Sequence, residues 1–371
     1  MTTQHHVLFK DLPEDIEYNF ENGLVVGKFA PITFGHINLI HKAATACRKL
    51  TVAMCYDDKF LSQQSPRDQK VLTYKNRMRW LKTVFADFDH INIVSIDETN
   101  IPAYPNGWAG YAELVRGIYG GKIPEDTAIF SSEIAYDDGY KTHLPELNHV
   151  VVDNDRTEVP ISATMVRNDL YKYWDLIPSC VRKDYALKVC VIGTESSGKT
   201  TLVRSMAKLL GTSWVEEYGR EYCMNVVGAD ERLLTSSDYE KIAFTHKTEE
   251  EKAMARANKV TFIDSNAFVT EFYHRLYEGK PNPVVSNIAL NEEYDLILYM
   301  SDDTTWVDDG LRVNGENRED TKKLFNDMLE EFPNQKEKMV LISGKNIRVR
   351  HQKAIEKVKA VLLYHNAGEQ V

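Results

Sequence analysis

The sequence predicts two tandem α/β domains, each a three-layer αβα arrangement with a parallel sheet covered by helices on both faces. Short apolar runs alternate with amphipathic helical stretches along the chain, which is typical of parallel sheets. A chain of 371 residues is long enough to form two separate cores. The alternation stops after Arg167, where Pro178 interrupts it, and restarts near Ala186. We therefore expect an N-terminal extension over 1–21, a first domain over 22–185 and a second domain over 186–371.

Five apolar runs in the first half have the length and composition of buried strands. They are Gly23–Gly27, Leu50–Tyr56, Ile91–Ile96, Thr127–Ser132 and His149–Asp153. Between them, the segments His36–Leu50 and Thr73–Phe85 place apolar residues with helical period. Strands separated by helices favour parallel pairing, so this half is expected to form its own sheet.

The second half repeats the alternation. The expected strands are Lys188–Gly193, Val260–Asp264, Leu296–Met300 and Met339–Ser343. Helical period occurs over Thr201–Leu210, Asp238–Asn258 and Arg350–Tyr364. Because no fixed-period repeat relates the two halves, we expect two different domains of the same class.

The composition excludes several classes of protein. The 45 Lys and Arg against 55 Asp and Glu give a formal net charge of -10. Such a chain is a poor candidate for coating nucleic acid, because that binding depends on neutralising phosphates. No stretch reaches the roughly 18 consecutive apolar residues of a membrane helix, and the first residues lack a signal-peptide layout, so a cytoplasmic protein is expected. The five scattered cysteines, without a Cys-x-x-Cys pair, are expected to be free thiols.

The segment Gly193–Thr200, GTESSGKT, fits the phosphate-loop pattern G-x-x-x-x-G-K-[ST] between a predicted strand and a predicted helix. Glycines let the backbone close around phosphates, while amide groups and the helix N-terminus supply partial positive charge. Lys199 would neutralise the β- and γ-phosphate oxygens of ATP, and Thr200 would ligate Mg²⁺. The expected ATP contacts of this segment are Gly193, Ser197, Gly198, Lys199, Thr200 and Thr201.

Two further segments are expected to complete this site. Asp264 closes a predicted strand, where a carboxylate can organise the metal or take a proton from the substrate. A capping role at the strand end is the alternative for Asp264. The polar stretch Trp306–Arg312 has the composition of a lid that closes Arg312 over the transferring phosphates, although a solvated loop would share that composition.

The first domain carries a second phosphate-binding pattern. After the first predicted strand, Thr33-Phe34-Gly35-His36 resembles the (H/T)-x-G-H signature of the nucleotidyltransferase superfamily. Gly35 would let the triphosphate approach the helix N-terminus, and Thr33 and His36 would donate hydrogen bonds to its oxygens. A histidine at an ordinary helix N-terminus, bonded to a local partner, would give the same pattern.

The segment Ile161–Arg167 resembles the I-S-x-T-x-x-R element that the same superfamily uses on the β- and γ-phosphates of ATP. Ser162 and Thr164 can cap a short helix and bond phosphate, and Arg167 adds a bidentate fork. An ordinary capped helix would also contain Ser and Thr. Both elements, in order within one α/β domain, indicate a Rossmann-like nucleotidyltransferase.

A nucleotidyltransferase domain followed by a phosphate-loop domain resembles the bifunctional nicotinamide-nucleotide adenylyltransferases and ribosylnicotinamide kinases of the NadR type. The resemblance covers nearly the whole chain, from about Gly23 to the last helix. The matching segments are Gly27–Ile40, Ile101–Trp108, Val152–Thr157, Gly193–Thr200, Glu216–Tyr222, Phe262–Thr270 and Trp306–Arg312.

For the second domain, the resemblance implies a P-loop kinase that uses ATP and Mg²⁺. The 5′-hydroxyl of nicotinamide riboside would attack the γ-phosphorus of ATP and give nicotinamide mononucleotide. Lys199 and Arg312 would neutralise charge, Thr200 would hold Mg²⁺, and Asp264 would act as base or metal ligand.

For the first domain, the resemblance implies adenylyl transfer from ATP to nicotinamide mononucleotide, giving NAD and pyrophosphate. Lys28, His36 and Arg167 would position the reactants and neutralise charge. Tyr104 or Trp108 would stack on the pyridinium ring of the mononucleotide, with a place in the core as the alternative.

Two more sets of contacts are implied for the second domain. Glu217 and Arg220, with the neighbouring Glu216, would hold the hydroxyls of the riboside, although a solvated charge cluster is the alternative. Arg348 or Arg350 would stack on adenine, and we assign this contact to Arg350.

The chain departs from the family pattern at three places and leaves some questions open. Ser265 and Asn266 follow Asp264 where a second carboxylate is common, Ala30 replaces a larger residue, and Thr33 replaces His. Residues 1–21 are too few for the helix-turn-helix repressor domain of some members, so no specific DNA binding is expected. A homo-oligomer is left open.

Two alternative functions share most of these motifs. The first is a related nucleotidyltransferase and kinase fusion with another nucleoside substrate. The second is a nucleotide-sensing regulator in which one domain is inactive. The partners expected under the main hypothesis are nicotinamide riboside, nicotinamide mononucleotide, ATP and the product NAD, with no membrane.

Overall fold

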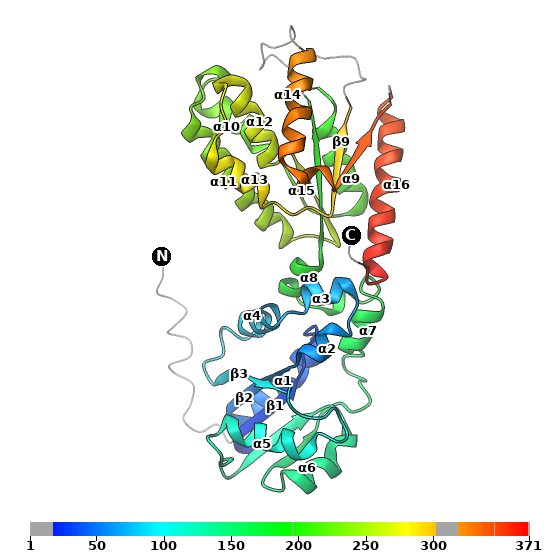
Figure 1. Ribbon diagram of the computed structural model, residues 1–371. Helices are drawn as coiled ribbons and strands as arrows, with labels where there is room; N and C mark the ends of the chain where they lie inside the picture. The colour runs from blue at the N-terminus through cyan, green and yellow to red at the C-terminus, as the bar shows by residue number, and fades with distance from the viewer. Residues whose placement is uncertain (1–17, 195, 302–317, 345, 370–371) are drawn as a thin grey trace. The chain divides into compact units, whose positions relative to one another are not determined.

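The computed structural model describes residues 18–194, 196–301, 318–344 and 346–369. Within them the chain forms two compact units, each built on a five-stranded parallel sheet (Figure 1). The first unit comprises residues 18–64, 68–167 and 175–178, and the other described residues form the second. These two sheets confirm the predicted fold class. Helix α8 (Ser179–Tyr185), which precedes the predicted boundary at Ala186, belongs to the second unit.

The sheet of the first unit has the strand order β3-β2-β1-β4-β5, and all neighbours run parallel. The strands are β1 (Phe20–Gly27), β2 (Cys47–Tyr56), β3 (Ile91–Asp97), β4 (Thr127–Ser131) and β5 (Asn148–Val151). All five predicted strands are present. β1 lies at the centre, between β2 and β4.

Helices cover both faces of this sheet. In chain order they are α1 (Phe34–Ala46), α2 (Asp58–Ser62), α3 (Pro66–Val71), α4 (Tyr74–Val84), α5 (Trp108–Ile118), the 3-10 helix η1 (Ile134–Tyr136), α6 (Asp137–His143) and α7 (Ala163–Asn168). Val115 of α5 and Tyr140 of α6 pack with Leu24 and Ile129 of the central strands. α1 buries Ile40 on the opposite face, because the right-handed crossovers from β1 to β2 and from β3 to β4 run in opposite directions along the sheet.

Helix α1 is shorter than the helical period of the sequence predicted. The helical pattern extends to Leu50, but α1 ends at Ala46 and β2 begins at Cys47. Cys47 pairs with Phe20 and Leu50 with Gly23 in the register of β1 and β2. The ladder hydrogen bonds and the burial of Cys47 and Leu50 therefore outweigh the local helical preference.

The sheet of the second unit has the strand order β10-β9-β6-β8-β7, also parallel throughout. The strands are β6 (Leu187–Gly193), β7 (Trp214–Val215), β8 (Val260–Asp264), β9 (Leu296–Met300) and β10 (Met339–Ile342). The four predicted strands are present. β7 was not predicted, because two residues carry no periodic signal.

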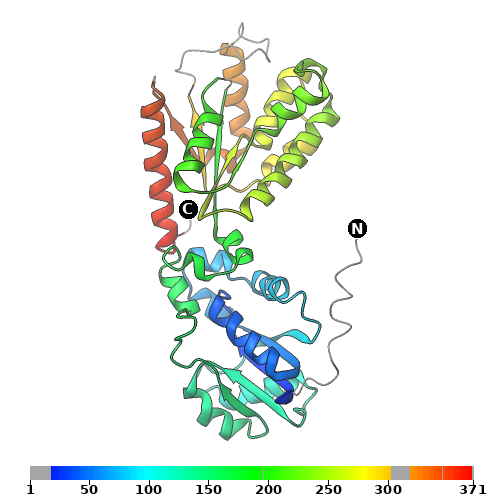
Figure 2. The same cartoon turned by 180° about the vertical axis from the view of Figure 1, so that it is seen from behind.

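Helices also cover both faces of the second sheet. The 3-10 helix η2 (Trp174–Leu176) lies at the junction, and Asp175 and Leu176 belong to the first unit. After α8, the helices of the second unit are α9 (Lys199–Leu210), α10 (Tyr218–Val226), the 3-10 helix η3 (Glu231–Leu233), α11 (Ser236–Met254), α12 (Ala267–Glu278), α13 (Pro283–Leu290), α14 (Arg318–Glu331), α15 (Pro333–Lys336) and α16 (Ile347–Asn366). Helices α9 and α16 lie on one face, and α10 to α13 lie on the other (Figures 1 and 2).

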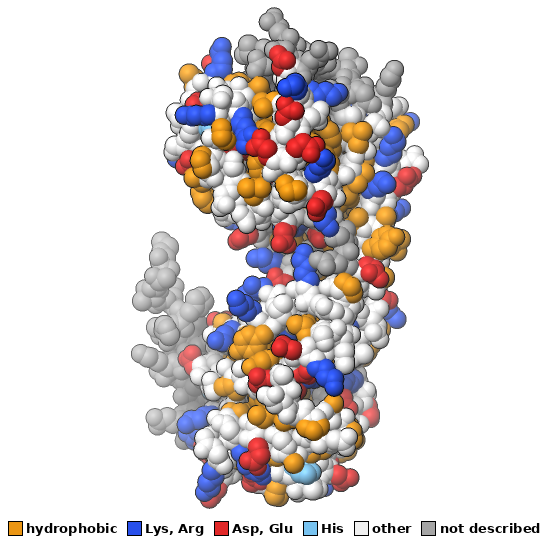
Figure 3. All heavy atoms as spheres, viewed as in Figure 1, with side chains coloured by type: hydrophobic (Ala, Val, Ile, Leu, Met, Phe, Trp, Pro, Cys, Tyr) orange, Lys and Arg blue, Asp and Glu red, His pale blue; other side chains and the backbone are white. Residues whose placement is uncertain are grey.

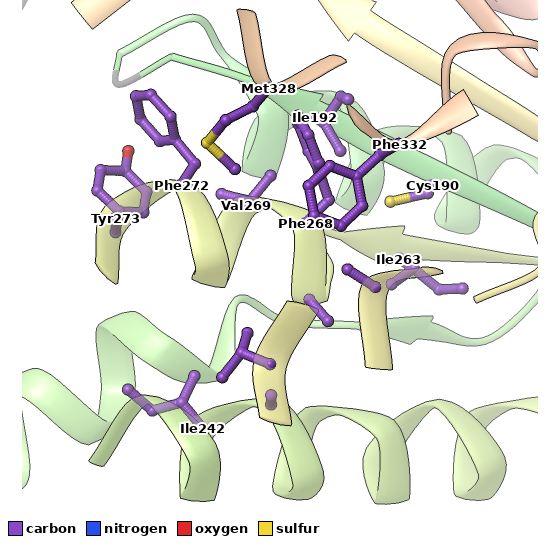
Figure 4. Packing of buried hydrophobic residues seen from close by; sticks show 14 of the residues in the cluster. Cys190, Ile192, Ile242, Ile263, Phe268, Val269, Phe272, Tyr273, Met328 and Phe332 are labelled. Atoms are coloured by element: carbon purple, nitrogen blue, oxygen red, sulfur yellow. The ribbon is translucent and has the colours of Figure 1, made fainter. Parts of the chain in front are cut away.

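The larger core of the second unit lies beneath α11 to α14. Figure 4 shows Phe268 and Phe332 packed over Ile263 and Cys190 of the sheet. Phe268 meets Phe332 and Phe325 edge-to-face, with ring centroids 5.3 and 5.2 Å apart. All five cysteines are free, and four of them are buried, which confirms the predicted free thiols.

The surface carries charges of both signs. In Figure 3, Lys and Arg side chains lie among Asp and Glu side chains over both units. Within the described ranges, no helix is long and apolar enough to cross a membrane.

We expect Phe268→Ala to lower the free energy of unfolding of the second unit by about 3–5 kcal/mol, because it leaves a cavity in a dense aromatic core. Phe244→Ala is the matched control, since Phe244 lies on α11 of the same unit with 58% of its surface exposed. It should change the free energy of unfolding by no more than about 0.5 kcal/mol. Urea titration of both variants measures the difference, and equal losses would place Phe268 outside the core.

Candidate functional site

The first candidate site begins at the turn between β1 and α1, where Thr33 and His36 form a reciprocal cap. The backbone N–H of Thr33 donates to Nδ1 of His36 at 3.1 Å, and Thr33 Oγ1 accepts from the backbone N–H of His36 at 3.4 Å. Because Nδ1 accepts, the neutral ring carries its proton on Nε2. Burial, with the positive charges of Arg156 and Arg167, lowers the pKa of His36 to about 4. At neutral pH, His36 therefore offers an uncharged Nε2–H donor.

The two predicted phosphate-binding elements of this unit meet at Gly35. A Cβ at Gly35 would lie 3.0 Å from the backbone oxygen of Ile161, so a larger residue would press the two segments apart. Ser162, next to Ile161, caps α7 by accepting from the backbone N–H of Met165 at 3.2 Å. The fold thus brings the start of α1 and the start of α7 together.

Arg167 ties α7 to the loop after β1. Its guanidinium donates to the backbone oxygen of Ala30 at 2.5 Å and to Thr164 Oγ1 at 3.0 Å. It also lies 5.6 Å from the ring centroid of Phe60. Arg167 and Thr164 therefore belong to the same cluster as the first element.

Lys28 is paired with two carboxylates that the sequence analysis missed. Its Nζ lies 2.8 Å from Glu98 and 3.3 Å from Asp57, and 5.0 Å from the ring centroid of Phe60. Burial by itself would lower the pKa of Lys28, but Glu98 and then Asp57 outweigh it and raise that pKa. Asp57 directly follows β2 and Glu98 directly follows β3, at or close to the ends of the two predicted strands, and parallel strands end at one edge of a sheet. Their position at the ends of neighbouring strands was the sequence signal that could have identified these two carboxylates.

A pocket opens beside Gly35 and His36, with a volume of about 800 Å³ that includes the open solvent at its mouth, and Lys28 and Arg167 are not among the described residues that line it. Arg156, also missed from the sequence, donates to Glu133 at 2.6 Å and to the backbone oxygen of Ile161 at 3.0 Å along its rim. The other residues that line the pocket are Val26, Gly27, Phe29, Gly35, His36, Asn38, Leu39, Ser131, Ser132, Tyr136, Val152, Asp153 and Val159.

The two aromatic residues expected on the substrate ring have different surroundings. Trp108 packs on α6: a Cβ at Gly139 would lie 2.1 Å from its ring, and its ring stacks on His143 with centroids 6.1 Å apart. Tyr104 is 63% exposed, and its ring centroid lies 5.7 Å from that of Tyr136, which lines the pocket. Trp108 is thus partly buried against the core cluster, and Tyr104 is the more exposed of the two rings. Stacking of either ring on the mononucleotide stays a prediction.

The second candidate site is the phosphate loop between β6 and α9. A Cβ at Gly193 would lie 2.6 Å from the backbone oxygen of Met300, so glycine is required where the loop leaves the sheet. Ser196 and Gly198 have φ of 54° and 88°, in the left-handed region, which bends the backbone around a central space. Glu195 lies outside the described residues.

Three side chains of the loop and the start of α9 differ in their burial and hydrogen bonds. Lys199, 6% exposed, begins α9, and its Nζ donates to the backbone oxygen of Thr194 at 3.3 Å. Ser197 is buried, and its Oγ has no hydrogen-bond partner among the described residues. Thr201 is exposed on the first turn of α9.

Thr200 and Asp264 form the polar centre of this site. Thr200 donates its hydroxyl to Asp264 Oδ2 at 2.5 Å, and Asp264 Oδ1 is buried without a partner in the described parts of the chain. Burial raises the pKa of Asp264, the negative charge of Glu217 adds to that, and Lys199 opposes it, which gives a pKa of about 7. The unsatisfied carboxylate oxygen beside a hydroxyl is a donor set that suits Mg²⁺.

Buried side chains fix the turn after Asp264 through hydrogen bonds. Ser265 has φ of 69°, and its backbone oxygen lies 3.1 Å from His246 Nε2 and 3.5 Å from the thiol of Cys190. Asn266 caps α12 and donates to Gln335 at 2.8 Å. The position where a second carboxylate is common therefore serves the helix cap.

A second pocket, of about 460 Å³ including open solvent, lies beside Asp264. Its lining is acidic and aromatic: Glu217, Tyr218, Gly219, Glu231, Leu234, Tyr239, Ile242, His246, Ser265, Asn266, Val269, Thr270 and Tyr273. The acidic pair of the sequence separates here, because Glu216 instead pairs with Arg204 at 2.8 Å. Arg220 is half-buried on α10 and is not among the described residues that line the pocket.

Of the two arginines expected to contact the nucleotide, the structure describes only Arg350. Arg350 does not offer a face to adenine: it is 0% exposed, and its guanidinium donates to the backbone oxygens of Ser197 and Gly344 and to Ser301 Oγ. In this structure, therefore, Arg350 is buried behind the phosphate loop, where its guanidinium contacts backbone oxygens. Arg312 lies outside the described residues.

Two family descriptions match the two halves. Residues 24–211 match the cytidylyltransferase-like family, and residues 188–344 match the AAA domain family. The trifunctional NAD biosynthesis/regulator protein NadR of Salmonella typhimurium strain LT2 is 35% identical over 313 residues, which cover 84% of this chain and 75% of the relative. The Escherichia coli K12 protein of the same name is 35% identical over 314 residues, covering 83% of this chain and 76% of the relative.

Two solved structures have a similar fold. A crystal structure of NadR protein in complex with NAD and AMP-PNP superposes with a TM-score of 0.72 at 25% identity, covering 95% of this chain and 97% of that one. A NadR protein in complex with NR gives a TM-score of 0.74 at 24% identity, covering 93% and 97%.

We expect His36 to stay neutral, with its proton on Nε2, until the pH falls to about 4. An unfolded histidine takes up a proton near pH 6.5, about the ordinary value. Between these two values the unfolded chain binds more protons, so His36 makes the fold less stable as the pH falls. Side-chain ¹⁵N NMR across this range measures the pKa and the tautomer, with His36→Asn to assign the signal. A ring that is protonated at pH 6 would contradict the assignment.

Proposed function

The chain belongs to the NadR family of NAD biosynthesis proteins, and on that premise we propose that it converts nicotinamide riboside to NAD in two ATP-dependent steps. The second unit is the ribosylnicotinamide kinase, and the first is the nicotinamide-nucleotide adenylyltransferase. The observation that carries the proposal is that each unit has its own pocket near a phosphate-binding turn. Gly35 and His36 line the pocket of the first unit, and the pocket of the second unit is lined by Ser265, next to Asp264, which accepts from Thr200 of the phosphate loop. The ligands in the two solved NadR structures, NR in one and NAD with AMP-PNP in the other, support this pairing of sites.

In the second unit, the phosphate loop holds the triphosphate of ATP, and Lys199 neutralises its β- and γ-oxygens. Thr200 and Asp264 would hold Mg²⁺, which when bound offsets the negative charge of the phosphates. The alternative role of Asp264 is that of a base: burial raises its pKa to about 7, which suits acceptance of the proton of the attacking 5′-hydroxyl at neutral pH when Asp264 does not itself ligate the metal. Arg312 is the proposed lid arginine.

The acidic and aromatic pocket beside Asp264 is the proposed riboside site. Glu217 lies in this pocket and is close enough to raise the pKa of Asp264. Nicotinamide riboside is a cation with a flat ring, so carboxylates and tyrosine faces are suitable partners. Glu217 accepts from the ribose hydroxyls in this proposal, with Arg220 of α10 as the second proposed contact.

In the first unit, the phosphate of nicotinamide mononucleotide attacks the α-phosphorus of ATP, and pyrophosphate leaves. The attacking phosphate is already anionic, so positioning and charge neutralisation are the main requirements. The Nε2–H of His36 donates to a phosphate oxygen, Arg167 and Lys28 supply positive charge, and the start of α1 supplies amide groups. Ser162, Thr164, Thr33 and Gly35 shape this phosphate site, and Tyr104 faces the pyridinium ring.

One incubation tests the whole proposal. The protein is mixed with Mg-ATP and nicotinamide riboside, and the products are separated chromatographically. ADP, nicotinamide mononucleotide and NAD are expected. Turnover of a different nucleoside would support a related fusion enzyme, and binding without turnover would support a nucleotide sensor.

We expect Lys199→Ala to abolish riboside phosphorylation and to leave adenylyl transfer to supplied mononucleotide within about twofold. The β- and γ-phosphates lose their main cation in the second unit, while the first unit is unchanged. ADP release and NAD formation are measured separately on the same preparation. A folded variant that loses both activities equally would disprove two independent sites.

We expect His36→Asn to reduce NAD formation from mononucleotide by about 10² to 10³, because it removes one preorganised donor. Asn can still accept at the position of Nδ1 and keep the cap, whereas Gln places an N–H near the position of Nε2. His36→Gln should therefore retain more activity than His36→Asn. The reverse order would show that His36 acts through the cap and not as a donor. ADP production from riboside is the control for both variants.

A further inference from the structure

We propose that Arg350 is a positioning residue that fixes the shape of the phosphate loop in the second unit. Arg350 lies in the first turn of α16 and is 0% exposed. One terminal nitrogen of its guanidinium donates to the backbone oxygen of Ser197, inside the loop, at 2.8 Å. This inference rests on the proposed kinase function in one respect, since it takes this loop to be the ATP site.

The contact with Ser197 controls the direction of an amide group. The carbonyl of Ser197 and the N–H of Gly198 belong to one planar trans peptide, so they point in opposite directions. A guanidinium that holds the carbonyl on one side therefore aims the N–H of Gly198 to the other side. Ser196 and Gly198 both have left-handed φ, so the peptide lies between two unusual backbone conformations and benefits from being fixed.

The same guanidinium joins three segments at the carboxyl edge of the sheet. Its Nε donates to the backbone oxygen of Gly344, after β10, at 2.6 Å, and another nitrogen donates to Ser301 Oγ, after β9, at 3.3 Å. Ser301 in turn donates its hydroxyl to the backbone oxygen of Ile342 at 3.2 Å. The phosphate loop is thus fixed to the ends of β9 and β10 through one side chain.

The geometry requires arginine. A guanidinium presents several N–H donors in a rigid plane and can reach three acceptors at once, whereas a lysine ammonium is a single point on a flexible stem. Arg350→Lys therefore keeps the charge and loses the fork. This distinguishes a positioning role from a purely electrostatic one.

The test compares Arg350→Lys with the parent chain in riboside phosphorylation. Losing hydrogen bonds from a charged donor should raise the KM for ATP by about 10- to 100-fold, while the KM for nicotinamide riboside changes by less than about twofold. Adenylyl transfer by the first unit is an internal control for folding and concentration. Lys357→Gln is the matched control, because Lys357 is an exposed cation on the same helix, and it should change neither KM.

A second variant keeps the proposal testable if Arg350→Lys folds poorly. Ser301→Ala removes one acceptor of the fork and should raise the KM for ATP in the same direction, by about 2- to 10-fold. Normal ATP kinetics in a folded Arg350→Lys, or equal changes in the KM values of ATP and riboside, would overturn the positioning role.

A binding measurement separates this proposal from the function itself. Titration with a fluorescent ATP analogue reports affinity without turnover, and Lys199→Ala defines the share of binding that belongs to the second unit. Arg350→Lys should weaken this part of the binding by about the same factor by which it raises the KM for ATP. If the parent chain binds the analogue but does not phosphorylate riboside, the proposed kinase function fails, and the effect of Arg350→Lys on binding still decides its role.

Discussion

Both sites depend on the central position of one strand in each sheet. β1 lies between β2 and β4, and β6 lies between β9 and β8. The chain first builds the strands on one side of each central strand, β2 and β3 or β7 and β8, and then crosses to the other side to form β4 and β5 or β9 and β10. Such a reversal leaves a crevice beyond the carboxyl end of the strand, and the following helix directs its N-terminus there. Thr33–His36 and Gly193–Thr200 both occupy that position. One topological constraint therefore gives two unrelated sequences the same ability to bind phosphate.

Burial then sets the charge of the reactive groups, with opposite consequences in the two units. Removing a side chain from water disfavours its charged form. His36 is consequently an uncharged donor, while Asp264, with a pKa of about 7, is able to exchange a proton at neutral pH. In the reactions proposed above, the first unit needs only to bind anionic groups, and the second also accepts the proton of a hydroxyl. The same physical effect supplies both requirements.

Each loop after a central strand is held from behind by a buried arginine. In the first unit, Arg77 is 2% exposed and donates to the backbone oxygens of Lys28 and Cys55 at 2.9 and 3.0 Å. In the second unit, Arg350 does the same for Ser197. A loop that turns its amide groups toward phosphate must find other partners for its carbonyls, since buried backbone groups are rarely left unpaired. A planar donor with several N–H groups meets that need.

The sequence by itself determined the two sheets and the two phosphate-binding turns, because apolar period and glycine spacing are local properties that each segment carries with it. It could not decide which distant side chains meet. The pairing of Lys28 with Asp57 and Glu98, the packing of Trp108 on α6 and the burial of Arg350 follow from strand register and crossover direction. The end of α1 at Ala46 was decided in the same way, by pairing with β1. These contacts join residues far apart in the chain, and only the folded backbone fixes the distances between them.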